Sequence, residues 1–526
     1  MISKLTPQNK GTEISSKLGS MFSTAKVPSY RDPRRLVPFY PDIKEVFSKS
    51  RDPDELEHYW TEWRKATGIP MKPMYDDVID VQNRIARDAG FDSAVESSNR
   101  DYEMPDVEAY ADEIFDRLRP LYEQLHAFVR RKLREKYGPS KVPESGPIPE
   151  HLLGDMHGRN WIDLEDIVSP FASSKDQLQS LEDEMNEQSF TPLRMFMLAE
   201  DFFKSLGLPG MTPEFWRNSI ITRPTEPGRE IECHGSAWDF HDGKDFRIKM
   251  CSTVSIKDLE TVHHEMGHVE YYEAYKGQPA LFQKGANPAF HEAIGDTISL
   301  SSMSMNHLNQ LGLLRRRGSE EKGEWKNESF RRYVGGGSAD LGEADLSYLF
   351  AKALATISFL PFGLLMDKWR WGVFRGEITP ENYNREWWKL KLKYQGVTPP
   401  PSQIRRRMDD ETLFDPGAKY HIPNSVGYIR YFFSFVLQFQ FYESMCEASG
   451  HVGPLHRCDF YGSTEAGEKL RQTMALGASR PWREALEEMT GKKEISADAI
   501  VKYFEPLRRY LEVENLKSGQ RIGWEH

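Results

Sequence analysis

The chain has 526 residues, of which 39% are hydrophobic, 12% aromatic and 28% charged, a composition typical of a folded protein with a large core. Its 69 basic and 80 acidic residues give a net charge of −11, which argues against a nucleic-acid partner. No apolar run reaches the roughly 18–20 residues that span a bilayer, and residues 1–8 lack the apolar core of a signal peptide. By these criteria alone the chain has no membrane span and stays in the cytosol.

Hydrophobic periodicity predicts a mainly α-helical protein. Residues 1–40 are polar and lack an apolar period, so we expect a flexible leader there, followed by one folded domain over residues 41–526. From Tyr110 to Phe128, apolar residues recur at three- and four-residue steps, which is the period of a helix. Helical patterns cover residues 54–66, 75–89, 107–137, 196–206, 341–371 and 427–448, with a kink or break near Pro361.

Strand-like runs are few. Residues 230–240 and 246–253 are expected to form a short hairpin around Gly243. Residues 315–337 are charged and glycine-rich, which predicts a surface loop.

The four cysteines, Cys233, Cys251, Cys446 and Cys458, fall in two locally spaced pairs. An even count with short intervening loops predicts two disulfides and an oxidising compartment, in conflict with the N-terminal sequence. Neither pair has the C-x-x-C spacing of a zinc site. One sequon, at Asn327, is compatible with glycosylation. On balance we favour secretion.

The strongest chemical signal is the pentapeptide HEMGH at residues 264–268. On a helix, His264 and His268 share a face and can bind one zinc ion, while Glu265 is placed to take a proton from a water molecule. Glu292 supplies a third ligand 24 residues after His268. Asp296 follows one turn later, where its carboxylate can hold the far nitrogen of a ligand histidine. Together these residues predict a zinc hydrolase.

Longer motifs around this site resemble the angiotensin-converting enzyme family of zinc peptidyl-dipeptidases and carboxypeptidases. The matching segments are residues 233–240 (CHGSAWDF), 243–249 (GKDFRIK), 263–272 (HHEMGHVEYY), 285–288 (GANP), 291–296 (HEAIGD), 369–374 (WRWGVF), 418–423 (AKYHIP) and 428–432 (YIRYF).

The resemblance implies a helical ellipsoid with two subdomains flanking a deep zinc cleft. The same resemblance makes residues 41–526 the metallopeptidase domain and pairs Cys233 with Cys251 and Cys446 with Cys458. It begins near residue 50, so we expect unrelated sequence before that point and missing N-terminal lid helices. Either the sequence is truncated or the enzyme has an open cleft, and truncation is the favoured interpretation.

The resemblance also implies roles for residues outside the zinc motif. Tyr431 is expected to donate to the oxyanion of the tetrahedral intermediate. His234 and His421 are expected to bind peptide carbonyls of the substrate, with His421 counted among the catalytic residues. Ala237 is expected to pair its backbone with the substrate.

Residue 159 makes the specificity ambiguous. Dipeptide-releasing members of the family bind the substrate's terminal carboxylate with a glutamine, a lysine and a tyrosine. Lys419 and Tyr428 match the last two, but Arg159 stands in place of the glutamine, as in the carboxypeptidase branch. That branch lacks the lysine, so the two signals conflict. We favour release of dipeptides from short peptides, with single-residue release as the alternative.

The family is activated by chloride, and five residues match its two chloride sites. Arg64, Trp387 and Lys391 are expected at the first, and Tyr102 and Arg430 at the second. Two other functions stay open. A zinc endopeptidase requires an open groove, and an inactive peptide-binding homologue would be expected to have lost zinc ligands.

Overall fold

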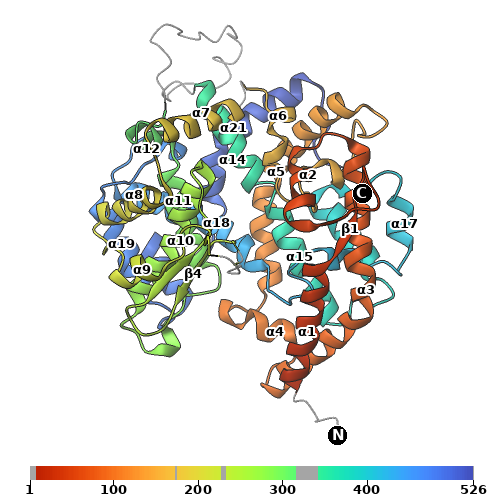
Figure 1. Cartoon of the computed structure of the whole chain (residues 1–526), viewed down its shortest axis with the longest axis horizontal. Helices are drawn as coiled ribbons and strands as arrows, with labels where there is room; N and C mark the ends of the chain where they lie inside the picture. Colours follow the sequence, from red (N-terminus) through yellow and green to blue (C-terminus); the bar gives the residue numbers. More distant parts are fainter. Residues whose placement is uncertain (1–6, 172–173, 227–230, 232, 315–341, 525–526) are drawn as a thin grey trace. The chain divides into compact units, whose positions relative to one another are not determined.

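The computed structural model describes residues 7–171, 174–226, 231, 233–314 and 342–524. The chain divides into two compact units (Figure 1). The first comprises Met1–Pro170, Phe350–Phe432 and Tyr510–His526, and the second comprises Phe171–Leu349 and Phe433–Arg509. Both are built almost entirely from helices, which confirms the mainly α fold.

The first unit contains the two long helices α3 and α5, with shorter helices and two short strand pairs, β1–β2 and β3–β6, around them. Its elements are α1 (Pro7–Thr24), β1 (Lys26–Pro28), β2 (Leu36–Pro38), η1 (Phe39–Ile43), α2 (Lys44–Lys49), α3 (Pro53–Asp88), α4 (Ala94–Asn99), η2 (Arg100–Tyr102), α5 (Val107–Tyr137), β3 (Ile148–Pro149), η3 (Glu150–Leu152), η4 (Ile162–Leu164), α6 (Glu165–Val168), α15 (Leu360–Phe374), α16 (Tyr383–Leu390), η6 (Lys391–Gln395), β6 (Val397–Thr398), α17 (Ile404–Asp409) and η7 (Asp415–Ala418).

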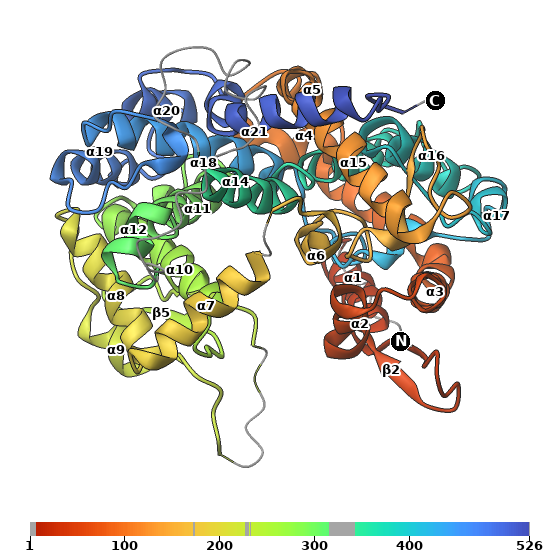
Figure 2. The same cartoon turned by 90° about the horizontal axis from the view of Figure 1, so that it is seen from above.

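The second unit is centred on helix α10, which packs against α8, α11 and α19; α19 and α20 lie side by side in Figure 2. Its elements are α7 (Ser174–Glu187), α8 (Pro192–Ser205), α9 (Pro213–Asn218), β4 (Ser236–Asp239), β5 (Phe246–Lys249), α10 (Ile256–Tyr275), η5 (Ala280–Phe282), α11 (Phe290–Ser302), α12 (Met305–Gln310), η8 (Leu455–Arg457), α19 (Thr464–Ala475) and α20 (Trp482–Thr490). The division between units falls within α14 (Glu343–Thr356), α18 (Ile429–Ala448) and α21 (Asp498–Lys517).

The expected flexible leader is wrong for residues 7–24, which form helix α1. Ile14, Leu18 and Phe22 recur every four residues and are 7%, 0% and 7% exposed, so they form the buried stripe of an amphipathic helix. Helix α1 packs on α3, and the Phe22 ring lies 5.2 Å from that of Trp63. Only three apolar residues carry this stripe, and the Ser, Lys and Gly residues between them hide it in the sequence.

Prolines had different effects at two predicted helix boundaries. The patterns over residues 54–66 and 75–89 belong to one 36-residue helix, α3, which continues through Pro70 and Pro73. By contrast, the predicted break near Pro361 is confirmed, because α14 ends at Thr356 and α15 begins at Leu360 with that proline in its first turn.

One apolar segment, Glu343–Phe374, is long and apolar enough to cross a membrane by length and composition. However, 78% of its most apolar window is buried inside the protein, which is the behaviour of core helices. It therefore gives only weak evidence for a membrane span. The predicted loop at 315–337 and the sequon at Asn327 lie outside the described residues.

Helices α10 and α11 cross at two glycines. A Cβ atom on Gly267 would lie 3.0 Å from the Cα of Gly295, and one on Gly295 would lie 2.7 Å from the carbonyl oxygen of His264. Cβ atoms do not approach backbone atoms this closely without a shift of the helices. The absence of both side chains therefore allows the second turn of α11, which contains Gly295, to rest directly on α10.

We expect Gly295→Ala to destabilise the protein by about 1–3 kcal/mol, because the added methyl group overpacks this crossing. Chemical denaturation measures the loss. Gly277→Ala is the matched control, since a Cβ there meets nothing within 4 Å, and its effect should stay within about 0.5 kcal/mol. Equal stabilities of the two variants would contradict the close crossing.

Candidate functional site

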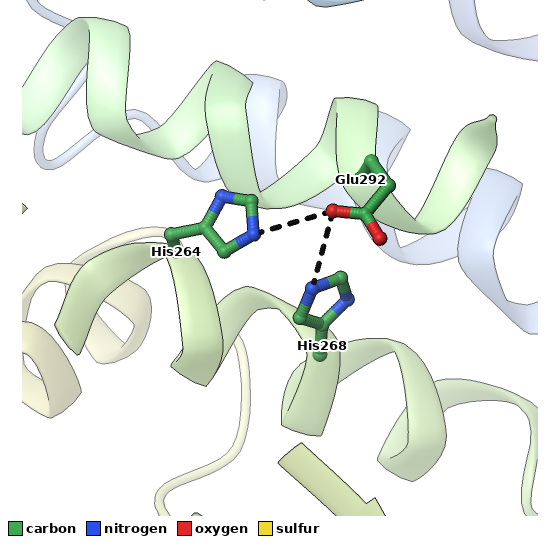
Figure 3. Close-up of side chains that lie close together, drawn as sticks. All are labelled: His264, His268 and Glu292. Atoms are coloured by element: carbon green, nitrogen blue, oxygen red, sulfur yellow. Dashed lines mark ion pairs between the residues drawn. The ribbon is translucent and has the colours of Figure 1, made fainter. Parts of the chain in front are cut away.

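Helix α10 presents two imidazoles to one carboxylate. Its N-terminus is capped by Ser255, whose hydroxyl accepts a hydrogen bond from the backbone N–H of Asp258. Figure 3 shows His264 and His268 one turn apart on α10, with Glu292 reaching between them from α11. The Oε2 atom of Glu292 lies 3.6 Å from His264 Nε2 and 3.9 Å from His268 Nε2.

This donor set suits a zinc ion. One ligand atom from each of the three residues lies within 4.8 Å of the others, and two imidazole nitrogens with one carboxylate leave a coordination position open. The Nδ1 atom of His264 lies 2.9 Å from Asp296 Oδ1, so the predicted role of Asp296 agrees with the geometry. This contact leaves the Nε2 atom of His264 directed at the ligand group.

The far nitrogen of His268 has a partner that the sequence did not reveal. Its Nδ1 atom lies 3.2 Å from His291 Nδ1, and the Nε2 atom of His291 lies 3.5 Å from the hydroxyl of Tyr275. Both ligand histidines are thus oriented from behind, one by a carboxylate and one by an imidazole. His291 is adjacent to Glu292 in the sequence, but this position alone does not indicate its contact with His268 on α10.

The electrostatics of the ligand group favour a bound cation. Burial lowers the pKa of His264, but Asp296 and Glu292 outweigh it and raise that pKa well above its usual value. Burial raises the pKa of Glu292, yet the hydrogen bond from His264 and the charges of His268 and His264 lower it to about 2. The negative charges of Asp296 and Glu292 thus favour a cation between the three ligand atoms.

Glu265 directly follows His264 on α10 and is 7% exposed. Burial raises its pKa, His264 opposes this shift, and Glu292 adds to it. A Cβ on Gly235 would lie 3.1 Å from Glu265 Oε1, so the chain at Gly235 passes directly beside this carboxylate. A raised pKa is appropriate for a group that takes and returns a proton near neutral pH.

The predicted hairpin is confirmed as β4 and β5, which pair antiparallel with Ala237 opposite Ile248. The hydroxyl of Tyr272 on α10 donates to the carbonyl oxygen of Ala237 at 3.3 Å. His234 lies just before β4, with its Nδ1 atom 2.7 Å from the oxygen of Gly235. The hairpin therefore holds His234 and Ala237 beside helix α10.

Both predicted disulfides are confirmed. Cys233 is bonded to Cys251, which ties the chain before β4 to the chain after β5. Cys446 is bonded to Cys458. The first bond anchors the segment that carries His234.

The first unit brings five other predicted residues into one cluster. The ring of His421 lies 4.7 Å from that of Tyr428 and 5.8 Å from that of Tyr431. Lys419 Nζ lies 5.4 Å from the Tyr428 ring, and Arg159 is hydrogen-bonded to Tyr428. We call Arg159, Lys419, His421, Tyr428 and Tyr431 the cationic cluster.

The cationic cluster carries more positive than negative charge. Arg159 Nε lies 3.4 Å from Asp155 Oδ2, while burial and the nearby Arg159 lower the pKa of Lys419 well below its usual value. The two side chains thus share one carboxylate, and the charged form of Lys419 is disfavoured. An additional carboxylate, such as a peptide C-terminus, would relieve this imbalance.

Asp367 positions the cationic cluster and was missed by sequence reasoning. Its Oδ2 atom accepts hydrogen bonds from the backbone N–H groups of Tyr428 (2.8 Å) and Ile429 (2.7 Å) at the start of α18. It also forms an ion pair with Arg370, which donates to the carbonyl oxygen of His421 at 3.4 Å. One carboxylate on α15 therefore fixes the segment that carries three cluster residues.

The residues expected at the first chloride position lie together, but around a carboxylate. Arg64 Nη2 lies 2.5 Å from Glu150 Oε2, and Lys391 forms an ion pair with the same carboxylate. Lys391 Nζ lies 5.9 Å from the centre of the Trp387 ring. At the second position, burial raises the pKa of Tyr102 and the positive charge of Arg430 opposes that shift.

Comparison with known proteins gives one consistent match. Residues 3–524 match the family model described as angiotensin-converting enzyme (Peptidase_M2). The expectation of unrelated sequence before residue 50 is therefore wrong. The match includes the residues of α1, the helix that packs on α3.

Three relatives illustrate the range. Angiotensin-converting enzyme of Bos taurus is 46% identical over 485 residues, which is 92% of this chain and 35% of that protein. Angiotensin-converting enzyme-like protein Ace3 of Mus musculus is 41% identical over 485 residues, 92% of this chain and 62% of that protein. Angiotensin-converting enzyme of Theromyzon tessulatum is 40% identical over 522 residues, 98% of this chain and 80% of that protein.

The chain thus spans about a third of the length of mammalian relatives such as the bovine one and most of the length of the Theromyzon protein. The family match and the sequence identities indicate the same family, and the geometry of His264, His268 and Glu292 is consistent with it. The chain belongs to the angiotensin-converting enzyme family.

Proposed function

We propose that the chain is a zinc metallopeptidase that releases C-terminal dipeptides from short peptides. The convergence of His264, His268 and Glu292 beside Glu265 carries this proposal. The names of the relatives support the same class of enzyme. The persistence of all three ligands and Glu265 disfavours an inactive peptide-binding homologue.

In this mechanism Glu265 moves the proton. When bound, the zinc ion activates a water molecule and polarises the substrate carbonyl. The Glu265 carboxylate takes a proton from that water and returns it to the leaving amine. The Tyr431 hydroxyl donates to the developing oxyanion, and His421 and His234 donate to peptide carbonyls. The backbone of Ala237 aligns the peptide along β4.

Recognition of the substrate's C-terminus is assigned to the cationic cluster. Arg159, Lys419 and Tyr428 together offer charged and neutral donors to one carboxylate. Lys419 supports release of dipeptides, as in the dipeptide-releasing members. Arg159 supports the alternative, release of single residues, because its bulk and charge would shorten the pocket and its guanidinium can bind the carboxylate through two parallel hydrogen bonds. Endopeptidase activity is disfavoured because this cluster selects a free C-terminus.

We also propose that the protein is secreted and that chloride activates it. Two disulfides support an oxidising compartment. Arg430 is partly buried, so an anion beside it would offset its positive charge and help to orient Tyr431. We expect turnover to fall when chloride is replaced by gluconate at constant ionic strength. Equal turnover in the two buffers would contradict chloride activation.

Glu265→Gln tests the mechanism. The amide keeps the shape of the side chain but cannot accept the proton, so we expect turnover to fall by at least about 100-fold. Zinc content, measured by mass spectrometry of the metal, should stay at the wild-type level. Glu260→Gln on the same helix is the control and should keep activity. An active Glu265→Gln variant would contradict the proposed proton transfer.

Arg159→Gln tests the specificity. The protein is incubated with a free-acid decapeptide, and fragment masses are followed over time. If Arg159 selects single residues in the wild type, the variant should shift the products towards loss of dipeptides. Arg119→Gln, a surface arginine paired with Asp116, serves as the control. An unchanged product ratio would remove Arg159 from the specificity argument.

A further inference from the structure

The first predicted chloride position is built around a buried side chain of the protein itself. Glu150 comes from η3, Arg64 from α3 and Lys391 from η6, and all three are at most 1% exposed. Glu150 Oε2 lies 2.5 Å from Arg64 Nη2, and its Oε1 atom is the partner of Lys391. The two cations expected to hold chloride therefore hold a carboxylate.

The backbone fixes this carboxylate in place. Ile148 and Pro149 form β3, which pairs parallel with β6, and the Ile148 N–H donates to the Gly396 oxygen at 2.9 Å. Glu150 follows directly and accepts a hydrogen bond from Trp60 Nε1 at 2.8 Å. The strand pair thus places Glu150 next to the turn that carries Lys391.

The terminal N–H groups of Arg64 already have partners, and of its guanidinium nitrogens only Nε is buried without a hydrogen bond. Arg64 Nη1 donates to the Trp60 oxygen (3.3 Å) and to Met156 Sδ (3.0 Å), and Nη2 donates to Glu150 and to the Met156 oxygen (2.9 Å). These bonds occupy all four terminal N–H groups of the guanidinium. Lys391 also donates to the His157 oxygen at 2.8 Å.

The charges around the cluster do not call for a second anion. Arg407, whose guanidinium lies 5.1 Å from the Trp60 ring, has its own buried partner in Asp415. Asp155, the carboxylate that Arg159 and Lys419 share, also attracts Arg64 and Lys391. A chloride ion beside Glu150 would place two negative charges in contact inside a water-excluded site, which is costly at low dielectric.

We infer that Glu150 is a built-in anion that replaces chloride between Arg64 and Lys391. The cluster is therefore complete without chloride, and any halide response of the protein arises elsewhere, at Tyr102 and Arg430. This inference does not depend on the proposed peptidase activity, and neither of its tests measures turnover.

The direct test is anomalous diffraction from crystals grown or soaked in sodium bromide. For the wild type we expect no bromide peak between Arg64 and Lys391. In Glu150→Ala, which removes the carboxylate and leaves space, a bromide peak should appear there. A bromide ion at this position in the wild type would overturn the inference, even if the variant did not fold.

The second test compares melting temperatures in sodium chloride and sodium gluconate at equal ionic strength. In gluconate, Glu150→Ala should melt about 5 °C or more below the wild type, because two buried cations lose their partner. Chloride should restore much of that loss in the variant. Leu152→Ala, a buried residue of the same turn, should be destabilised equally in both salts. Chloride stabilisation of Glu150→Ala no greater than that of Leu152→Ala would contradict the inference.

Discussion

The crossing of α10 and α11 controls the geometry of the three proposed metal ligands. Gly267 and Gly295 leave no side chain between the helices, so Glu292 on the first turn of α11 reaches both histidines of α10. The same contact brings Asp296 to the far side of His264 and His291 to the far side of His268. A methyl group at residue 295 would lie 2.8 Å from His264 Nδ1, so it would disturb a ligand as well as the packing. The same close helix contact therefore determines both the packing of α10 on α11 and the positions of the proposed ligands.

The proposed functional residues belong to both units. The second unit holds the ligands, Glu265 and the β4–β5 hairpin, which a disulfide ties together. The first unit holds the cationic cluster, where Arg159 and Lys419 share Asp155, and the Arg64–Glu150–Lys391 cluster, where an acidic side chain balances two buried cations. Both clusters contain more than one cation, but only the cationic cluster has an arginine side chain that is 34% exposed. Partial exposure suits a ligand-binding role, whereas complete burial suits a structural one.

Local signals allowed much of the site to be predicted from the sequence. His264, His268 and Glu265 follow from helix periodicity, and α5 extends over the predicted residues because its apolar period is unbroken. The leader was mispredicted because three apolar residues of α1 carry the whole packing signal. Glu150, His291 and Asp367 were missed for a different reason: each acts through a contact with a residue far away in the sequence or on another helix. Such roles depend on tertiary structure, which no local pattern encodes.

The central claim is that α10 and α11 together form a three-ligand zinc site. The most direct measurement is the metal content of the purified protein combined with X-ray absorption spectroscopy at the zinc edge. The account predicts one zinc ion per chain, coordinated by two imidazoles and by oxygen ligands, and loss of that ion in His264→Ala. A protein that binds no zinc, or a spectrum with sulfur ligands, would contradict it.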